Sequence, residues 1–179
     1  MAVDIDVVIE NSVQTLEKRH FGATASDLLG TVNTDGAYIV ADKPFVLDMR
    51  GVKTLQNYGL IGKFARTGVV EARLDDLGDL ELQRQLFYTF YGATKLKKVV
   101  MGTVDVLGEY TCHGTFANCH GLEEFEGHLD FLSGEYCCTG MFANCAALKE
   151  SPLKTVTLIG GTYATQHMCQ NTTFEDAGV

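Results

Sequence analysis

The chain has 179 residues, of which 46% are hydrophobic, and this composition fits one globular domain with a substantial core. The formal net charge of -9 at pH 7 repels phosphate backbones and anionic lipid on average, so we expect no nucleic-acid partner. No apolar run is long enough to cross a bilayer, and we expect no membrane insertion.

The first residues carry no recognisable targeting segment. Asp4 and Asp6 stand where a secretory signal peptide carries Lys or Arg, and no apolar core region follows them. The residues alone therefore leave the compartment unknown, and a cytoplasmic location stays open.

Residues 1–37 differ from the rest of the chain and are expected to form an α/β cap. The segment 11–19 predicts a short helix, with Ser12 as its N-cap and Arg19 near its C-terminal end. A cap is expected because the open end of a solenoid exposes apolar surface and strand edges. The alternative is that this segment docks the chain to a larger assembly.

Two strands are predicted next, over residues 37–40 and 45–47, on either side of Pro44. From residue 38 to residue 179 we expect one solenoid domain, with clear repeats over residues 87–174.

The repeats have a period of 26 residues. The tetrad Phe-Ala-Asn-Cys at 116–119 recurs at 142–145, and other columns of the sequence follow the same interval. One column contains Phe64, Phe90, Phe116, Phe142 and Met168; a second contains Leu80, Val106, Leu132 and Leu158; a third contains Gly108, Gly134 and Gly160.

Stacking explains why such short units fold. The apolar stretches of one unit are too short for a stable helix, and one hairpin cannot bury both of its faces. Stacked units bury one continuous core. We therefore predict a repeat solenoid, mainly β with short helical or 3-10 turns, of the leucine-rich-repeat-like kind, whose units have 20–29 residues.

The repeated motif resembles the BspA-type leucine-rich repeat. The matching residues are Phe116, Cys119, Leu122, Gly134, Tyr136, Phe142, Cys145, Leu148 and Gly160. The resemblance departs from the family pattern before the Phe, where Thr115 and Met141 replace Ala. It implies a bacterial surface or secreted protein that binds partner proteins.

The six cysteines lie mostly in repeat columns, such as Cys119 with Cys145. A free buried Cys behaves as a small hydrophobe, so we expect core packing. The pairs Cys112-His113 and Cys119-His120 could supply four metal ligands, but neither His recurs in the next unit. We therefore expect no metal and no cofactor.

A charged column follows the Leu column and alternates in sign. It reads Lys97, Glu123, Lys149 and Glu175. In stacked coils these side chains face one another about 4.7–4.9 Å apart, so opposite charges hold the register. We expect this structural role in preference to a ligand-binding role, because a neutralised ladder attracts few charged ligands.

No catalytic motif is present, and we expect no enzyme activity. The predicted function is a non-catalytic module that binds a protein or another ligand through side-by-side strands. The alternative is a structural component of a cell-surface or phage-tail-like assembly. The candidate binding residues are exposed aromatic and charged side chains, namely Tyr88, Tyr91, Lys97, Lys98, Glu123, Glu124 and Lys149.

Overall fold

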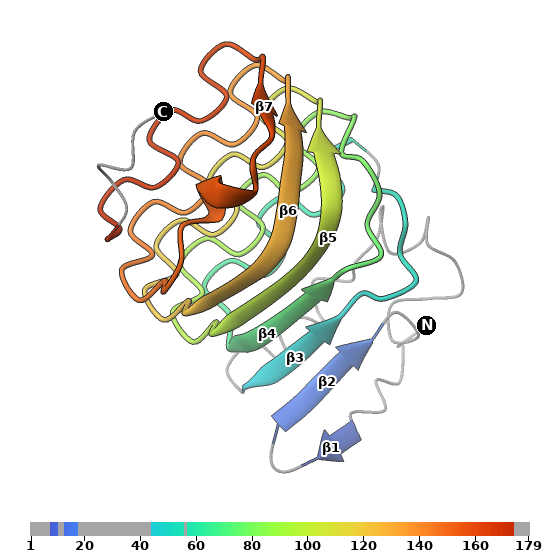
Figure 1. The fold of residues 1–179 in the computed structure, drawn as a ribbon. Helices are drawn as coiled ribbons and strands as arrows, with labels where there is room; N and C mark the ends of the chain where they lie inside the picture. Colours follow the sequence, from blue (N-terminus) through green and yellow to red (C-terminus); the bar gives the residue numbers. More distant parts are fainter. Residues whose placement is uncertain (1–7, 11–12, 18–43, 56, 174–179) are drawn as a thin grey trace.

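A computed structural model describes residues 8–10, 13–17, 44–55 and 57–173 of the chain. Its strands form one seven-stranded sheet in the order of the sequence (Figure 1). The strands are β1 (Val8–Glu10), β2 (Val13–Glu17), β3 (Phe45–Asp48), β4 (Val69–Leu74), β5 (Lys98–Val106), β6 (Glu124–Leu132) and β7 (Leu158–Ile159).

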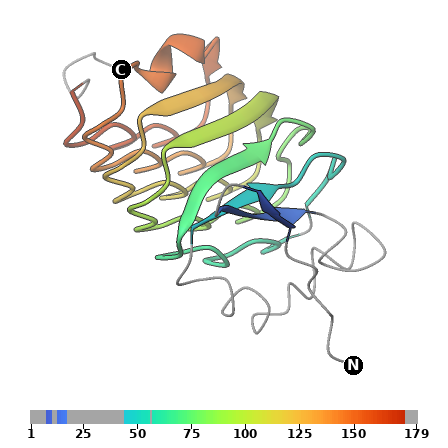
Figure 2. The same cartoon turned by 90° about the horizontal axis from the view of Figure 1, so that it is seen from below.

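The predicted repeat solenoid is confirmed as a parallel β-solenoid. Strands β2 to β7 pair in parallel, and each strand is followed by a return across the opposite side of the molecule (Figures 1 and 2). Between β5 and β6 the register is 26 residues, as in the pairs Lys98 with Glu124 and Val99 with Phe125. The stacking interval read from the sequence is therefore the interval between coils.

The return side is a wall of consecutive turns, which we call the turn wall (residues 58–66, 84–92, 110–118, 136–144 and 163–171). The helical turns expected there are absent from these residues. The helical element within the described part of the chain is η2 (Pro152–Thr155), which lies before β7. The prediction of short helical turns was therefore wrong for the turn wall.

The turn wall has a period of four residues, set by its backbone. In one coil Tyr110, Gly114 and Asn118 adopt left-handed φ angles of 54°, 58° and 62°. Alternate amides donate to the next coil, such as Cys112 N to Cys137 O at 2.7 Å. The amides between them close local turns, such as Ala117 N to Gly114 O at 3.1 Å. Both sides of each coil thus satisfy their backbone groups by stacking.

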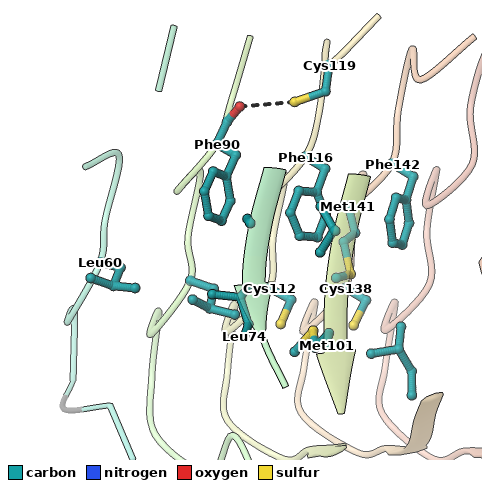
Figure 3. Close-up of a cluster of buried hydrophobic side chains, with 14 of the residues drawn as sticks. Leu60, Leu74, Phe90, Met101, Cys112, Phe116, Cys119, Cys138, Met141 and Phe142 are labelled. Atoms are coloured by element: carbon teal, nitrogen blue, oxygen red, sulfur yellow. Dashed lines mark hydrogen bonds between the residues drawn. The ribbon is translucent and has the colours of Figure 1, made fainter. Parts of the chain in front are cut away.

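The core lies between the sheet and the turn wall and is built from the repeat columns. The rings of Phe90 and Phe116 stack with centroids 5.4 Å apart, and Phe116 and Phe142 repeat that distance (Figure 3). All three rings are fully buried. Replacing one such ring by Ala typically costs 3–5 kcal/mol of stability, so this column is a main source of cohesion between coils.

The cysteines pack in this core, and all six are free and buried. Cys119 Sγ donates a hydrogen bond to the carbonyl of Phe90 in the preceding coil at 3.1 Å, as Figure 3 shows. Cys145 Sγ repeats the contact with Phe116 O at 3.1 Å. Burial raises the pKa of Cys119 to about 12, so this thiol is neutral at physiological pH.

The last described coil departs from the predicted register by one residue. Leu132 pairs with Ile159, not Leu158, so one extra residue precedes β7. As a result Gly161, not Gly160, lies against the backbone of Gly134.

The shift continues through the turn wall. Phe142 N donates to Met168 O at 2.8 Å, whereas the equivalent bond one coil earlier runs from Phe116 N to Met141 O. Cys169 therefore takes the place after Met168 that Phe142 takes after Met141, and Met168 is not in the Phe column as the constant period predicted.

The amino-terminal predictions have mixed outcomes. The helix predicted over 11–19 is wrong for residues 13–17, which form β2 and pair in parallel with β3. The strand predicted over 45–47 is confirmed as part of β3. The strand predicted over 37–40 lies outside the described residues.

Candidate interaction surface

The seven candidate residues fall into two separate groups. Tyr88 and Tyr91 lie on the turn wall, where both side chains are partly buried. The charged candidates lie at the corner where the turn wall leads into the sheet, just before or at the start of β5 and β6 or in the matching turn of the next coil. They are Lys97, Lys98, Glu123, Glu124 and Lys149.

The charged corner forms the predicted ladder for its described members. Glu123 lies between Lys97 and Lys149, with a carboxylate oxygen 3.0 Å from each Nζ atom. Glu124 Oε1 adds a second contact to Lys149 at 3.2 Å. Glu175 lies outside the described residues. The side chains of this corner are therefore largely engaged with one another.

The pairing also shows in the acid–base properties of Glu123. Hydrogen bonds from Lys97 and Lys149 hold the pKa of this carboxyl below its usual range. Lys149 has a raised pKa because it donates to Glu123 and Glu124. Opposite charges that neutralise one another offer a charged ligand little net attraction.

The two tyrosines belong to a surface cluster of aromatic rings. The Phe87 ring stacks on His113 at 5.1 Å and meets Tyr88 edge-on at 4.4 Å. Tyr88 also contacts Tyr91 at 5.2 Å, and its hydroxyl lies 3.2 Å from Nε2 of His113. The Tyr88 ring lies over Gly114, where a Cβ would collide with it. Such contacts hold the rings in fixed positions.

A stripe of stacked side chains continues this cluster along the turn wall. It has one member from each coil: Tyr58, Arg84, Tyr110, Tyr136 and Tyr163. The rings of Tyr110 and Tyr136 stack at 5.0 Å, and Tyr136 and Tyr163 repeat that distance. The end members Tyr58 and Tyr163 are 50% and 54% exposed, so the stripe reaches solvent at both ends.

Arg84 joins the stripe to the ring cluster. Its Cζ atom lies 5.9 Å from the Tyr58 ring in the preceding coil and 5.3 Å from the Tyr110 ring in the following one. It also lies 5.5 Å from the ring of Phe87. A second guanidinium, that of Arg66, lies 5.9 Å from the Tyr91 ring. These are cation–π distances.

We call this surface the aromatic patch. It consists of Tyr58, Arg66, Arg84, Phe87, Tyr88, Tyr91, Tyr110, His113, Tyr136 and Tyr163.

His113 lies inside the patch as a neutral group at physiological pH. Burial, aided by the nearby positive charge of Arg84, holds the pKa of His113 below its ordinary value. Its Nδ1 atom is buried and has no hydrogen-bond partner among the described residues. The guanidinium groups are therefore the charged groups at the centre of the patch.

Sequence reasoning found two members of the patch and missed the stripe. Tyr110 and Tyr136 share the 26-residue interval, and the same step backward reaches Arg84 and Tyr58. Extending that column in both directions would have found the stripe as far as Tyr58. Tyr163 escapes the rule because it lies 27 residues after Tyr136, beyond the inserted residue.

The two Cys-His pairs do not converge. His113 faces the aromatic patch, whereas Nδ1 of His120 lies 2.9 Å from the carbonyl of Asn144. In the described part of the chain no group of three or more His, Cys, Asp or Glu side chains is arranged to hold a metal ion. The same residues include no helix with the length and apolarity needed to span a membrane.

Comparison with known proteins finds no match for this chain, neither among models of protein families nor among curated proteins or solved structures.

Proposed function

We propose that this protein is a non-catalytic protein-binding module and that the aromatic patch on the turn wall is its recognition surface. One observation carries the proposal: Tyr and Arg side chains are concentrated and held in place there, while the charged corner is engaged internally. Tyr and Arg are enriched at protein interfaces, and Tyr contributes contact area at a small entropic cost. The resemblance to BspA-type leucine-rich repeats adds support.

The test compares captured partners of three forms of the full chain. Protein extracts of the native source are passed over the wild type, over Tyr88→Ala/Tyr91→Ala, and over Lys97→Ala/Glu123→Ala, followed by a salt wash. We expect a partner that the corner variant retains and the patch variant loses, with an affinity loss of about 2 kcal/mol for truncated aromatic anchors. Equal retention by both variants would remove the patch from the proposal.

A second candidate function is a structural role in a larger assembly, and one observation favours it. At the end of the described solenoid, Leu158 and Tyr163 are 57% and 54% exposed, and β7 is a short edge strand. Edges of this kind pair with further strands. Sedimentation velocity distinguishes the two roles, because self-assembly through this end predicts a mass that rises with concentration, whereas a binding module stays a single species.

A further inference from the structure

The guanidinium of Arg84 lies in an unusual environment for a protein surface. Its neighbours in the stripe, Tyr58 and Tyr110, come from the coils on either side, and Phe87 lies within 5.5 Å. Rings on two sides restrict the group without using its N–H donors, because a cation–π contact engages the face of the ring and not a hydrogen-bond acceptor. The guanidinium is thus preorganised.

The donors of this guanidinium have no acceptor within residues 44–55 and 57–173. No ion pair or hydrogen bond of the Arg84 side chain occurs there, although the chain carries 23 acidic residues. The carboxylate of nearby Glu109 accepts instead from the Gln83 amide at 2.8 Å. Arg66 is in the same situation, since its described contact is with the ring of Tyr91.

We propose that Arg84 is the anchor for a carboxylate of an acidic peptide segment, with Asp or Glu next to an aromatic or apolar residue. This inference rests on the proposed role of the patch as the recognition surface. A planar guanidinium binds a carboxylate through two parallel N–H···O bonds, and the rings around it accept the apolar neighbour. A dense polyanion is disfavoured by the net charge of -9, whereas a single carboxylate pays little repulsion.

Arg66 provides a second, more peripheral cation for such a segment. The printed ring contacts run without a break from Arg84 through Phe87, Tyr88 and Tyr91 to Arg66. A segment that lies across these rings meets a guanidinium at each end. The pattern expected in the partner is therefore two acidic residues that flank an aromatic or apolar centre.

The experiment selects short random peptides displayed on phage against the immobilised full chain and then measures the affinity of the selected peptides by fluorescence anisotropy. We expect Asp and Glu to be enriched over the unselected library. Arg84→Gln should weaken binding roughly tenfold or more, because it removes a charge-assisted bidentate contact. Arg84→Lys should recover only part of the affinity, because an ammonium lacks the planar fork.

Two controls separate recognition from charge and from folding. Lys154→Gln removes one positive charge from an exposed residue of η2, outside the patch, and should leave the affinity unchanged. Changing the peptide's Asp or Glu to the amide should cost the same as Arg84→Gln, and the two changes together should cost no more than either alone. Unchanged circular dichroism verifies that the variants are folded.

Each remaining outcome contradicts a defined part of the proposal. Peptides that bind the patch, and are lost with Tyr88→Ala, but show no acidic enrichment would overturn the role of Arg84 and leave the proposed function standing. An equal effect of Arg84→Gln and Lys154→Gln, or a requirement for a phosphorylated residue, would also overturn it. Selection of no binding peptide at all would contradict both the inference and the proposed function.

Discussion

Left-handed backbone at every fourth residue is the feature on which the turn wall depends. Most of these residues are not glycine, and each such residue costs about 1–2 kcal/mol relative to right-handed backbone. Contacts between coils offset this cost. Asn144 Nδ2 donates to Asn118 Oδ1 at 2.8 Å, Asn171 repeats the bond to Asn144, and Tyr110 stacks on Tyr136. The side chains that form the stripe are thus also the ones that stabilise the strained positions.

At the residue scale, the one-residue shift predicts different tolerance at adjacent glycines. A Cβ on Gly161 would collide with the backbone oxygen of Gly134, whereas a Cβ on Gly160 would meet Phe131 Cε2 at 3.3 Å, which a side chain can relieve. We expect Gly161→Ala to lower the free energy of unfolding by about 1–3 kcal/mol and Gly160→Ala to lower it less. Urea denaturation measures both, and the reverse order would support the unshifted register.

The buried thiols predict a loss of stability at alkaline pH. Burial raises the pKa of Cys119 to about 12 and that of Cys169 to about 11, against an ordinary value of 9.0. The folded state therefore holds these protons more tightly, so their contribution is complete below pH 9 and is lost as pH rises toward the folded values.

The variant Cys119→Ala should show a shallower decline of the free energy of unfolding between pH 9 and pH 11. One thiol contributes a slope of up to about 1.4 kcal/mol per pH unit. Urea denaturation across this range, with a reductant present, measures the slope. The same slope in the variant and the wild type would mean that Cys119 does not titrate on unfolding.

At the scale of elements, each coil has one strand and one row of turns, and the charged corner joins them. The ladder of Lys97, Glu123 and Lys149 crosses three successive coils and stabilises their alignment. Its side chains are more than one third exposed, so each pair contributes little and is screened by salt.

Reversing the central charge tests this role. Glu123→Lys places an ammonium between two others, so we expect a small decrease in Tm at low salt. The decrease should shrink at 1 M NaCl, where the Debye length is about 3 Å. Adding Lys97→Glu to this variant restores one opposite pair and should recover part of the loss. A decrease that does not depend on salt would indicate a packing effect and not a charge effect.

At the scale of the whole molecule, the solenoid lets coils at its end open independently of those at its centre. Each coil contacts its neighbours alone, so stability is close to a sum of coil and interface contributions. The coil of residues 110–118 has a neighbour on each side, whereas the coil of residues 163–171 is the last described one. Local opening should therefore begin at the latter.

Amide hydrogen exchange measures this gradient. We expect the amide of Cys112, which donates to Cys137 O, to exchange more slowly than that of Cys138, which donates to Ala164 O in the last described coil. Phe116→Ala should reduce protection on both sides of the central coil, because that ring contacts Phe90 and Phe142. Uniform protection across the coils would mean that the solenoid opens as one unit.

The aromatic patch could be predicted from the sequence only in part. Tyr88 and Tyr91 were candidates because they are large and near a repeat boundary, but their grouping with the charged corner was wrong. The structure separates the two sets, since the tyrosines lie on the turn wall and the charges at its junction with the sheet. The environment of Arg84 needs side chains from three coils, which no local pattern contains.

The sequence by itself determined the stacking of coils, because a repeated unit buries the same columns against themselves at a constant interval. The columns of Phe90, Phe116 and Phe142 and the ladder through Glu123 follow directly from the 26-residue period. Tertiary structure alone decided which side chains face solvent on the turn wall. Its period of four, set by left-handed residues, is neither the 3.6 of a helix nor the 2.0 of a strand, and it exists only because alternate amides bond to the next coil.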